Sequence, residues 1–129
     1  MVKNKLKASE HDEQALLFKW AQLHERKWPA LACLYAVPNA GKRSIRAAAY
    51  MKAEGLKSGV PDVFLPVSRG GFIGLVIEMK VGRNKPTANQ NTWMNRLQSQ
   101  GHHVVVCYSF EDAKELVEWY LRLEVRKVA

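Results

Sequence analysis

The feature that most constrains the fold of this chain is a pair of β-rich segments joined by a glycine turn. Residues 60–67 and 72–80 are mostly β-branched, aliphatic or aromatic, and Ser68-Arg69-Gly70-Gly71 lies between them. Two such segments on either side of a short loop that contains glycine are typical of a β-hairpin. We therefore expect two antiparallel strands in the middle of the chain.

The hairpin brings charged residues together. Asp62 and Glu78 are each eight positions from Gly70, so a turn centred on Gly70 places them opposite each other. Residues that face each other in an antiparallel pair have Cβ atoms about 4.5–5.5 Å apart. Side chains alternate along a strand, so Lys80 lies on the same face as Glu78, whereas Met79 points to the core.

This pairing predicts a metal site. Two carboxylates held together repel each other, and a hard divalent cation is the usual compensation. Mg²⁺ or Mn²⁺ between Asp62 and Glu78 could polarise a phosphodiester and activate water, while Lys80 orients that water or stabilises the developing charge. The pattern indicates hydrolysis of a nucleic-acid backbone.

A simpler interpretation is an ordinary cross-strand ion pair on a solvated hairpin face. For an isolated D…E-x-K pattern this would be the better explanation. Here, however, Asp62 follows Gly59-Val60-Pro61, and Glu78 follows Gly74-Leu75-Val76-Ile77. An unpaired charge at the end of such an apolar strand is costly, which favours a functional site.

The remaining segments predict one α/β domain. Helical periodicity or helix-capping residues are found at 9–27, 44–54, 87–100 and about 109–126, and apolar strand-like runs at 31–37 and 104–108. The expected order is α-β-α-β-β-α-β-α, with a mixed sheet flanked by helices over residues 9–129 and a basic tail over residues 1–8.

Composition narrows the environment and the partners. Twenty Lys and Arg residues against twelve Asp and Glu residues give a net charge of +8, which favours a polyanion such as DNA. No apolar run approaches the roughly 20 residues of a membrane helix, and the basic start lacks the apolar segment of a secretory signal, so we expect a cytoplasmic protein without membrane contact. Cys33 and Cys107 are expected to be buried, reduced thiols.

Four stretches together resemble the PD-(D/E)xK nucleases and, within them, the VRR-NUC (virus-type replication-repair nuclease) group, especially its small stand-alone phage members. They are Val37-Pro38-Asn39-Ala40-Gly41-Lys42-Arg43, Gly55-Leu56-Lys57-Ser58-Gly59-Val60-Pro61-Asp62, Val76-Ile77-Glu78-Met79-Lys80, and Gln90-Asn91-Thr92-Trp93 through Leu97 and Gly101. The resemblance covers roughly residues 9 to 121. Ala40 stands where many relatives have glycine, a loop change that leaves the metal ligands untouched.

The resemblance implies a restriction-endonuclease-like core and assigns roles to individual residues. Asp62 and Glu78 bind the metal, the Met79 carbonyl completes its inner shell, and Lys80 acts in catalysis. Gln90 matches a helix glutamine that supports the site. The N-terminal acid matches Glu10, four residues before Gln14, and these two would share a helix face with Leu17 and Ala21. Glu13 is the alternative acid, and either residue could simply favour the helix N-terminus.

Basic residues near these motifs are candidates for contacts with DNA phosphates, although each could equally be solubilising charge. They are Lys42, Arg43, Arg46, Lys57, Arg83 and Lys85. Gly41-Lys42-Arg43-Ser44 lacks the upstream glycine of a phosphate-binding P-loop, so no nucleotide cofactor is expected. The four tryptophans are expected to pack in the core more than to stack on bases.

The function expected from the resemblance is a metal-dependent endonuclease that acts as a homodimer on branched DNA such as Holliday junctions. A four-way junction needs two active sites for symmetric cleavage, and one chain supplies one. A flap or single-strand nuclease remains open. From a different class, the chain could be a non-catalytic DNA-binding module that retains the fold.

Overall fold

The computed structural model describes residues 9–38 and 44–125. In this part of the chain a four-stranded sheet with the order β1-β2-β3-β4 is flanked by helices. The strands are β1 (Tyr35–Ala36), β2 (Val63–Leu65), β3 (Leu75–Met79) and β4 (His103–Cys107). The helices are α1 (Glu10–Leu23), the 3₁₀ helix η1 (Pro29–Cys33), α2 (Ile45–Ala53), α3 (Ala88–Ser99) and α4 (Phe110–Leu121).

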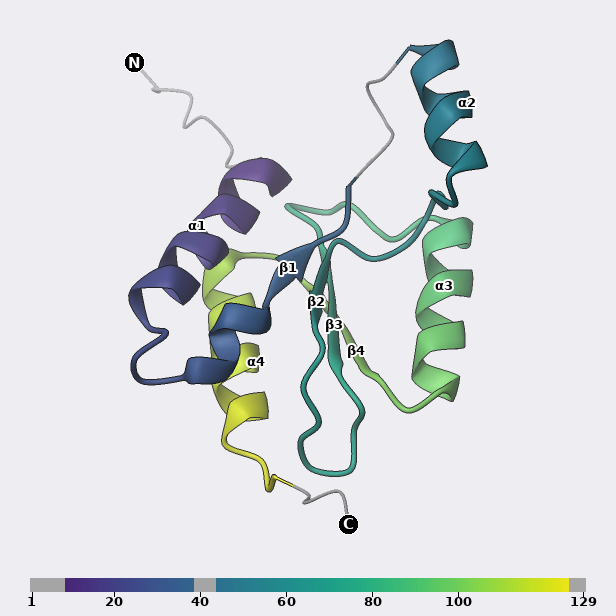
Figure 1. The fold of residues 1–129 in the computed structure, drawn as a ribbon. Coiled ribbons are helices and arrows are strands. Elements are labelled where there is room, and N and C mark those ends of the chain that lie inside the picture. Colours follow the sequence, from purple (N-terminus) through teal and green to yellow (C-terminus); the bar gives the residue numbers. More distant parts are fainter. Residues whose placement is uncertain (1–8, 39–43, 126–129) are drawn as a thin grey trace, which may run out of the picture.

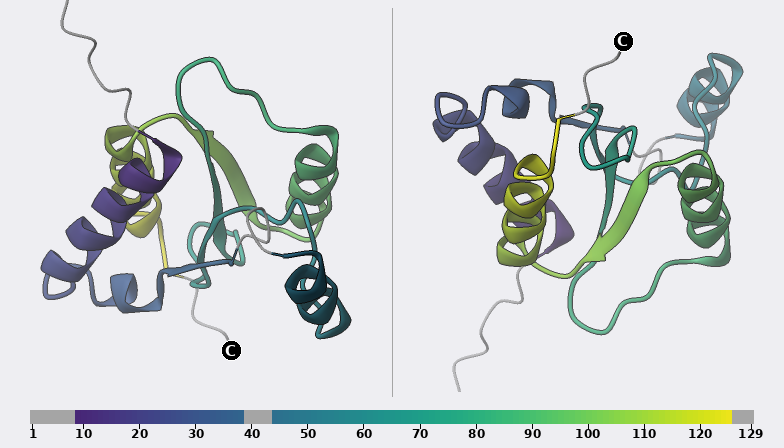
Figure 2. Two further views of the ribbon diagram at one scale, coloured as in Figure 1. Left: turned by 90° about the horizontal axis from the view of Figure 1, so that it is seen from above. Right: turned by 90° about the horizontal axis from the view of Figure 1, so that it is seen from below.

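The sheet is mixed, as the sequence predicts. β1 pairs antiparallel with β2, β2 antiparallel with β3, and β3 parallel with β4. Helices α1 and α4 lie on one side of the sheet and α3 lies on the other, so both faces are covered (Figures 1 and 2). Every residue of the central strand β3 is buried for this reason.

The hairpin register is confirmed. Val63 pairs with Ile77, Phe64 with Val76, and Leu65 with Leu75, the pairing that a turn centred on Gly70 requires. Gly70 and Gly71 both have positive φ, at 57° and 90°, which explains why two glycines occupy the turn. The Tyr120 hydroxyl of α4 donates a 2.7 Å hydrogen bond to the Val67 carbonyl and fastens the hairpin to that helix.

The core fills the space between the sheet and the helices α1 and α4. Leu75, Ile77 and Met79 of β3 point into it, together with Leu17 of α1 and Val117 of α4. Val76 and Glu78 alternate with these core residues and therefore lie on the opposite face of β3. This alternation orients Glu78 away from the main core, as expected, although the side chain is still buried.

The expected strand at 31–37 is wrong over most of its length. Residues Pro29–Cys33 form η1, and only Tyr35–Ala36 pair with β2. Proline has the backbone angle of a first helical turn, and a short apolar run does not distinguish a strand from a partly buried helix. Within η1 only the Leu31 side chain is buried. Cys33 is therefore exposed, contrary to expectation, whereas Cys107 is buried as expected.

Several helix ends also differ from the predicted ones. α1 ends at Leu23 instead of residue 27, and α4 ends at Leu121 instead of residue 126. Ser9, Ser44, Thr87 and Ser109 cap the N-termini of the four α-helices with their side chains. No helix in the described ranges has the length and apolar character needed to cross a bilayer.

Candidate active site

The predicted acidic pair meets where β2 begins and β3 ends. When the register that pairs Val63 with Ile77 is extended by one residue, it places Asp62 beside the end of β3. There Asp62 Oδ2 accepts a 2.8 Å hydrogen bond from the Met79 amide, so the side chain takes the place of a strand partner. On the other side, the Lys80 amide donates to the Cys107 carbonyl at 2.9 Å, which ties the end of β3 to β4.

Glu78 and Lys80 are the buried charged residues of the described core, at 1% and 8% exposure. Lys80 Nζ lies 3.7 Å from Glu78 Oε1, a distance that suits an ion pair more than a short hydrogen bond. The other carboxylate oxygen, Oε2, is buried and has no hydrogen-bond partner in the described part of the chain. Such an orphaned oxygen is costly unless another group binds it.

The electrostatics of the pair reflect this burial. Burial in the first place and the nearby Asp62 charge in the second raise the pKa of Glu78 to about 8, and the Lys80 ammonium opposes both effects. The pKa of Asp62 is also raised by burial, although the Met79 amide counteracts the shift. Both carboxyl groups are thus disfavoured as free anions, and a bound cation would stabilise their charged forms.

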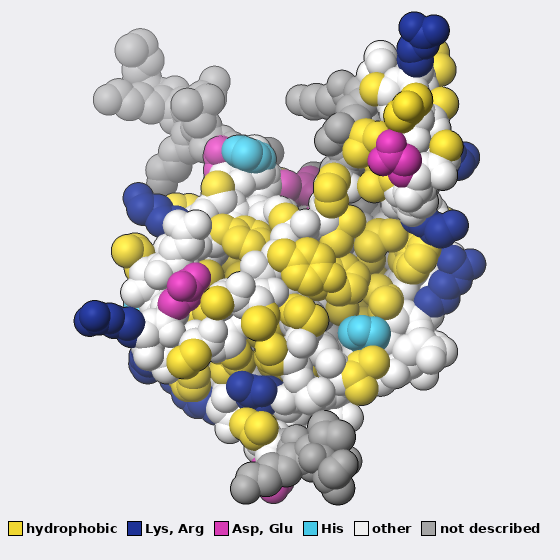
Figure 3. Space-filling model, viewed as in Figure 1, with side chains coloured by type: hydrophobic (Ala, Val, Ile, Leu, Met, Phe, Trp, Pro, Cys, Tyr) yellow, Lys and Arg dark blue, Asp and Glu magenta, His cyan; other side chains and the backbone are white. Residues whose placement is uncertain are grey.

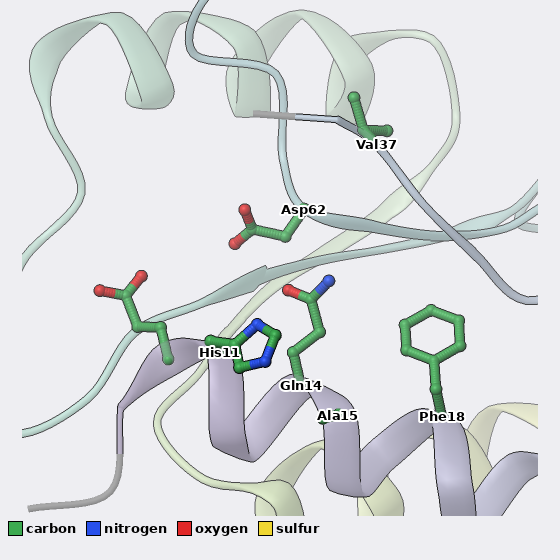
Figure 4. A pocket seen from close by; sticks show the side chains of 7 residues that line it. His11, Gln14, Ala15, Phe18, Val37 and Asp62 are labelled. Atoms are coloured by element: carbon green, nitrogen blue, oxygen red, sulfur yellow. The ribbon is translucent and has the colours of Figure 1, made fainter. Parts of the chain in front are cut away.

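Helix α1 lines the site across from Asp62. A hollow of about 340 Å³ opens beside Asp62, and it is lined by Glu10, His11, Gln14, Ala15, Phe18, Val37 and Asp62. The Asp62 carboxylate and the side chains of His11, Gln14 and Phe18 face this space (Figure 4). The Glu10 charge contributes to the raised pKa of Glu78 and so lies within electrostatic reach of the buried pair.

The structure separates the two candidate N-terminal acids. Glu10 lines the hollow with Asp62. Glu13 instead turns to α4, where its Oε1 accepts a 3.2 Å hydrogen bond from the Phe110 amide in the first turn of that helix. Glu13 therefore has a structural contact at a helix N-terminus, and Glu10 is the acid positioned at the site.

The donor set suits a hard divalent cation. Asp62 and Glu78 offer carboxylate oxygens, and one of these is the unpartnered Oε2. The Met79 amide points towards Asp62, and within a strand the carbonyl of a residue faces the same side as its amide. Among the described residues no cluster of three or more His, Cys, Asp or Glu side chains is arranged to hold a metal.

Comparison with known proteins connects this arrangement to a family. The family model of the VRR-NUC domain matches residues 5–111, which include every element from α1 to β4. The chain belongs to the VRR-NUC family. A VRR-NUC domain is a nuclease-type domain that acts on DNA, and half-buried Asp62 and the buried Glu78 and Lys80 lie within the matched residues.

A solved structure titled "VRR_NUC domain protein" has a similar fold. Its TM-score is 0.79 at 24% sequence identity, and the alignment covers 93% of each chain. At this identity the likeness supports the α/β architecture. A search of curated proteins found no match.

Other residues predicted for the site are distributed more widely over the VRR-NUC domain. Gln90 is the third residue of α3, and its Oε1 accepts a 2.9 Å hydrogen bond from the Thr87 amide as part of a capping box. This contact fixes the start of α3. Support of the site by Gln90 stays a prediction.

The basic candidates for DNA contact are solvent-exposed. Arg46 lies on α2, Lys57 follows that helix, and Arg83 and Lys85 lie in the loop after β3. Lys42 and Arg43 lie outside the described residues. Exposure is compatible with phosphate binding. The contact of these residues with DNA stays a prediction.

The residues of the predicted α1 face have two surroundings. Leu17 and Ala21, expected to share a face with Glu10 and Gln14, are buried in the core. Phe18 and His11 line the hollow with Glu10 and Gln14. The spacing of four residues from Glu10 to Gln14 and again to Phe18 is the signal that identifies this stripe.

Proposed function

We propose that this VRR-NUC domain is a Mg²⁺- or Mn²⁺-dependent endonuclease that hydrolyses phosphodiester bonds in branched DNA. The observation that carries the proposal is the cluster of half-buried Asp62 with buried Glu78 and Lys80, in which Glu78 Oε2 has no partner among the described residues. Withdrawing two acids from water without full compensation is costly for stability, and function is the common reason for retaining such groups.

Asp62, Glu78 and the Met79 carbonyl would hold the cation. When bound, the ion would supply Lewis-acid activation of the phosphodiester and of a water molecule. The Met79 amide keeps Asp62 in position through the 2.8 Å hydrogen bond. The burial of Glu78 excludes bulk water from one side of the pair and strengthens its interaction with any cation.

Lys80 is the residue proposed to act on the reacting atoms. Its Nζ lies 3.7 Å from Glu78 Oε1 and is itself nearly buried, so its position is restricted. From this place the ammonium can donate a hydrogen bond to the attacking water or to a non-bridging phosphate oxygen. Charge that develops on the phosphate is thereby stabilised in a partly dehydrated environment.

The proposed active unit is a homodimer, because symmetric cutting of a four-way junction requires two sites. Helix α2 supports this assembly. It has nine residues, none of them buried, and it makes no extensive contact with another described helix or strand. Helices this short are marginal in water without packing, and Ile45 and Tyr50 expose 92% and 72% of their surface.

A hydrophobic surface continues from α2 towards the sheet edge. Tyr35 of the edge strand β1 is 47% exposed and stacks on Phe64 of β2 with ring centroids 5.7 Å apart. Figure 3 shows hydrophobic side chains gathered between α1 and α3 and again on α2. A second copy of the chain is the proposed occupant of this surface.

The test is a cleavage assay with matched DNA substrates. A four-way junction, a flap, a linear duplex and a single strand of the same sequence are each incubated with Mg²⁺, Mn²⁺ or EDTA. We expect metal-dependent cutting that is fastest on the junction and abolished by Asp62→Asn. Equal cutting of all four substrates would reject the preference for branched DNA, and cutting in EDTA would reject the metal-dependent mechanism.

A further inference from the structure

A second hollow lies between α2 and α3. Its volume is about 500 Å³, within the roughly 300–1,000 Å³ typical of ligand pockets. It is lined by Ala48, Lys52, Leu56, Lys57, Ser58, Trp93 and Arg96. None of these residues lines the hollow beside Asp62, so the two spaces are separate.

The lining of the α2–α3 hollow is cationic. Lys52, Lys57 and Arg96 contribute three positive charges, and the lining contains no carboxylate. All three side chains are exposed, and none forms an ion pair with another described residue. Lys and Arg side chains also gather beside the junction of the two helices in Figure 3. Uncompensated positive charge around a concave surface favours an anionic ligand.

The hollow also contains an aromatic surface. Trp93 is half-buried, and the Arg96 guanidinium lies over its ring, 5.3 Å from the centroid. An arginine over an indole places a cationic group beside an aromatic ring, and nucleic-acid bases stack well on both kinds of group. Lysines next to such a plane suit the phosphate that accompanies a base. The chemistry of the hollow therefore matches a nucleotide better than an isolated phosphate.

The backbone links this hollow to the active site. Ser58 is four residues before Asp62, and a chain of that length spans at most about 14 Å. Asn89 Nδ2 of α3 donates to both the Ser58 carbonyl and its Oγ at 3.0 Å, which anchors the connecting loop on the helix. One DNA strand could thus contact both places.

We propose that the α2–α3 hollow binds an unpaired nucleotide of the DNA substrate, with its base against the Trp93–Arg96 pair and its phosphate at Lys52 and Lys57. The proposal rests on the nuclease function above and adds a substrate feature to it. A paired base is already stacked within the duplex and is not free to enter. The hollow therefore distinguishes DNA with an unpaired strand from continuous duplex.

The test measures binding in EDTA, so that it does not depend on cleavage. Fluorescence anisotropy with a labelled duplex that carries a single-stranded arm is compared with the same duplex fully paired. Arg96→Ala and Trp93→Ala should each weaken binding of the armed duplex by roughly tenfold or more, because loss of one stacking contact has about this effect. Binding of the paired duplex should change by less than about fivefold, the range expected of one surface charge.

Two control variants separate stacking from charge and folding. Arg96→Lys keeps the charge but removes the planar group, so it should lose most of the affinity that Arg96→Ala loses. Lys114→Ala removes a charge from α4, on the other side of the sheet, and should leave both affinities unchanged. Arg96 is exposed, so its variants should fold even if Trp93→Ala does not.

The outcomes are distinct from those of the cleavage assay. Equal losses for armed and paired duplex would overturn the proposal, as would unchanged binding in the Arg96 variants. Competition by polyglutamate but not by a short oligothymidylate would also overturn it and indicate an acidic protein partner. A chain that binds the armed duplex as predicted but does not cut DNA with Mg²⁺ or Mn²⁺ would fail only the nuclease proposal.

Discussion

At the scale of single residues, Glu78 couples stability to function. The unfolded chain releases the Glu78 proton near its ordinary pKa of 4.5, whereas burial in the folded chain raises this pKa to about 8. Between these values the unfolded state binds fewer protons than the folded state. The metal-free protein should therefore lose stability as the pH rises from about 5 to 8.

This prediction is tested by thermal unfolding in EDTA across that pH range. We expect the melting temperature of the native chain to fall by roughly 5–10 °C. Glu78→Gln should show a smaller fall, because only Asp62, whose pKa is also raised by burial, still contributes. Mn²⁺ should restore the lost stability at pH 8. A flat profile for the native chain, or the same slope in Glu78→Gln, would contradict the proposed energetics.

Lys80 should matter for catalysis and not for metal binding. Lys80→Ala is expected to reduce the cleavage rate by roughly 10²–10⁴-fold, the usual contribution of a positioned proton donor or charge stabiliser. Mn²⁺ binding should persist, because the oxygen donors remain. The measurement is single-turnover cleavage beside a metal titration, with Lys114→Ala as the control. Undiminished cleavage in Lys80→Ala would remove this residue from the mechanism.

The positions of Asp62, Glu78 and Lys80 could be predicted because they depend on local rules. Strand alternation and a glycine turn fix which residues face each other, and the observed register agrees. The choice between Glu10 and Glu13 could not be made in this way. It depends on how α1 is rotated against the sheet, and that rotation is set by long-range packing of Leu17 and Trp20 in the core.

At the scale of elements, the loop between α2 and β2 positions Asp62. Gly59 in this loop has a φ of 86°, and a Cβ at this position would lie 2.6 Å from Asn89 Nδ2 and 2.8 Å from Asn89 Cγ. A side chain there would displace Asn89 from its hydrogen bonds with Ser58. The loop thus depends on glycine both for its conformation and for its contact with α3.

We therefore expect Gly59→Ala to reduce the free energy of unfolding by about 2–4 kcal/mol, as backbone strain and lost hydrogen bonds add. Cleavage should also slow, because the loop holds Asp62. Gly55→Ala is the matched control, since Gly55 also has a positive φ, at 103°, but has nothing within 4 Å of the added Cβ. Denaturant unfolding of both variants provides the comparison. An equal loss in the two would show that the contact with Asn89 contributes nothing.

Elements were predicted best where a pattern is long and periodic. The helices α1, α2, α3 and α4 and the strands β2, β3 and β4 were all expected, with differences mainly at their ends. The segment 29–36 was misassigned because Pro29 and a short apolar run are compatible with both a helix turn and a strand. Only contact with α1 and β2 decides the outcome there.

At the scale of the whole molecule, α2 should join two copies of the chain. Light scattering over a range of concentrations should give twice the 14.7 kDa chain mass for the native protein. Tyr50→Glu should shift the protein to monomer, because it places a charge in the proposed apolar contact. Leu23→Glu, at a 73% exposed position on α1, is the matched control and should leave the dimer intact. A native chain that is monomeric at every concentration would exclude this assembly.

The central claim for the molecule is that Asp62 and Glu78 form a cation site. Isothermal titration of Mn²⁺ into the metal-free chain at pH 8 tests this claim most directly. We predict at least one saturable site per chain that Asp62→Asn removes and that Lys80→Ala retains. Absence of binding to the native chain, or equal binding by Asp62→Asn, would contradict the account.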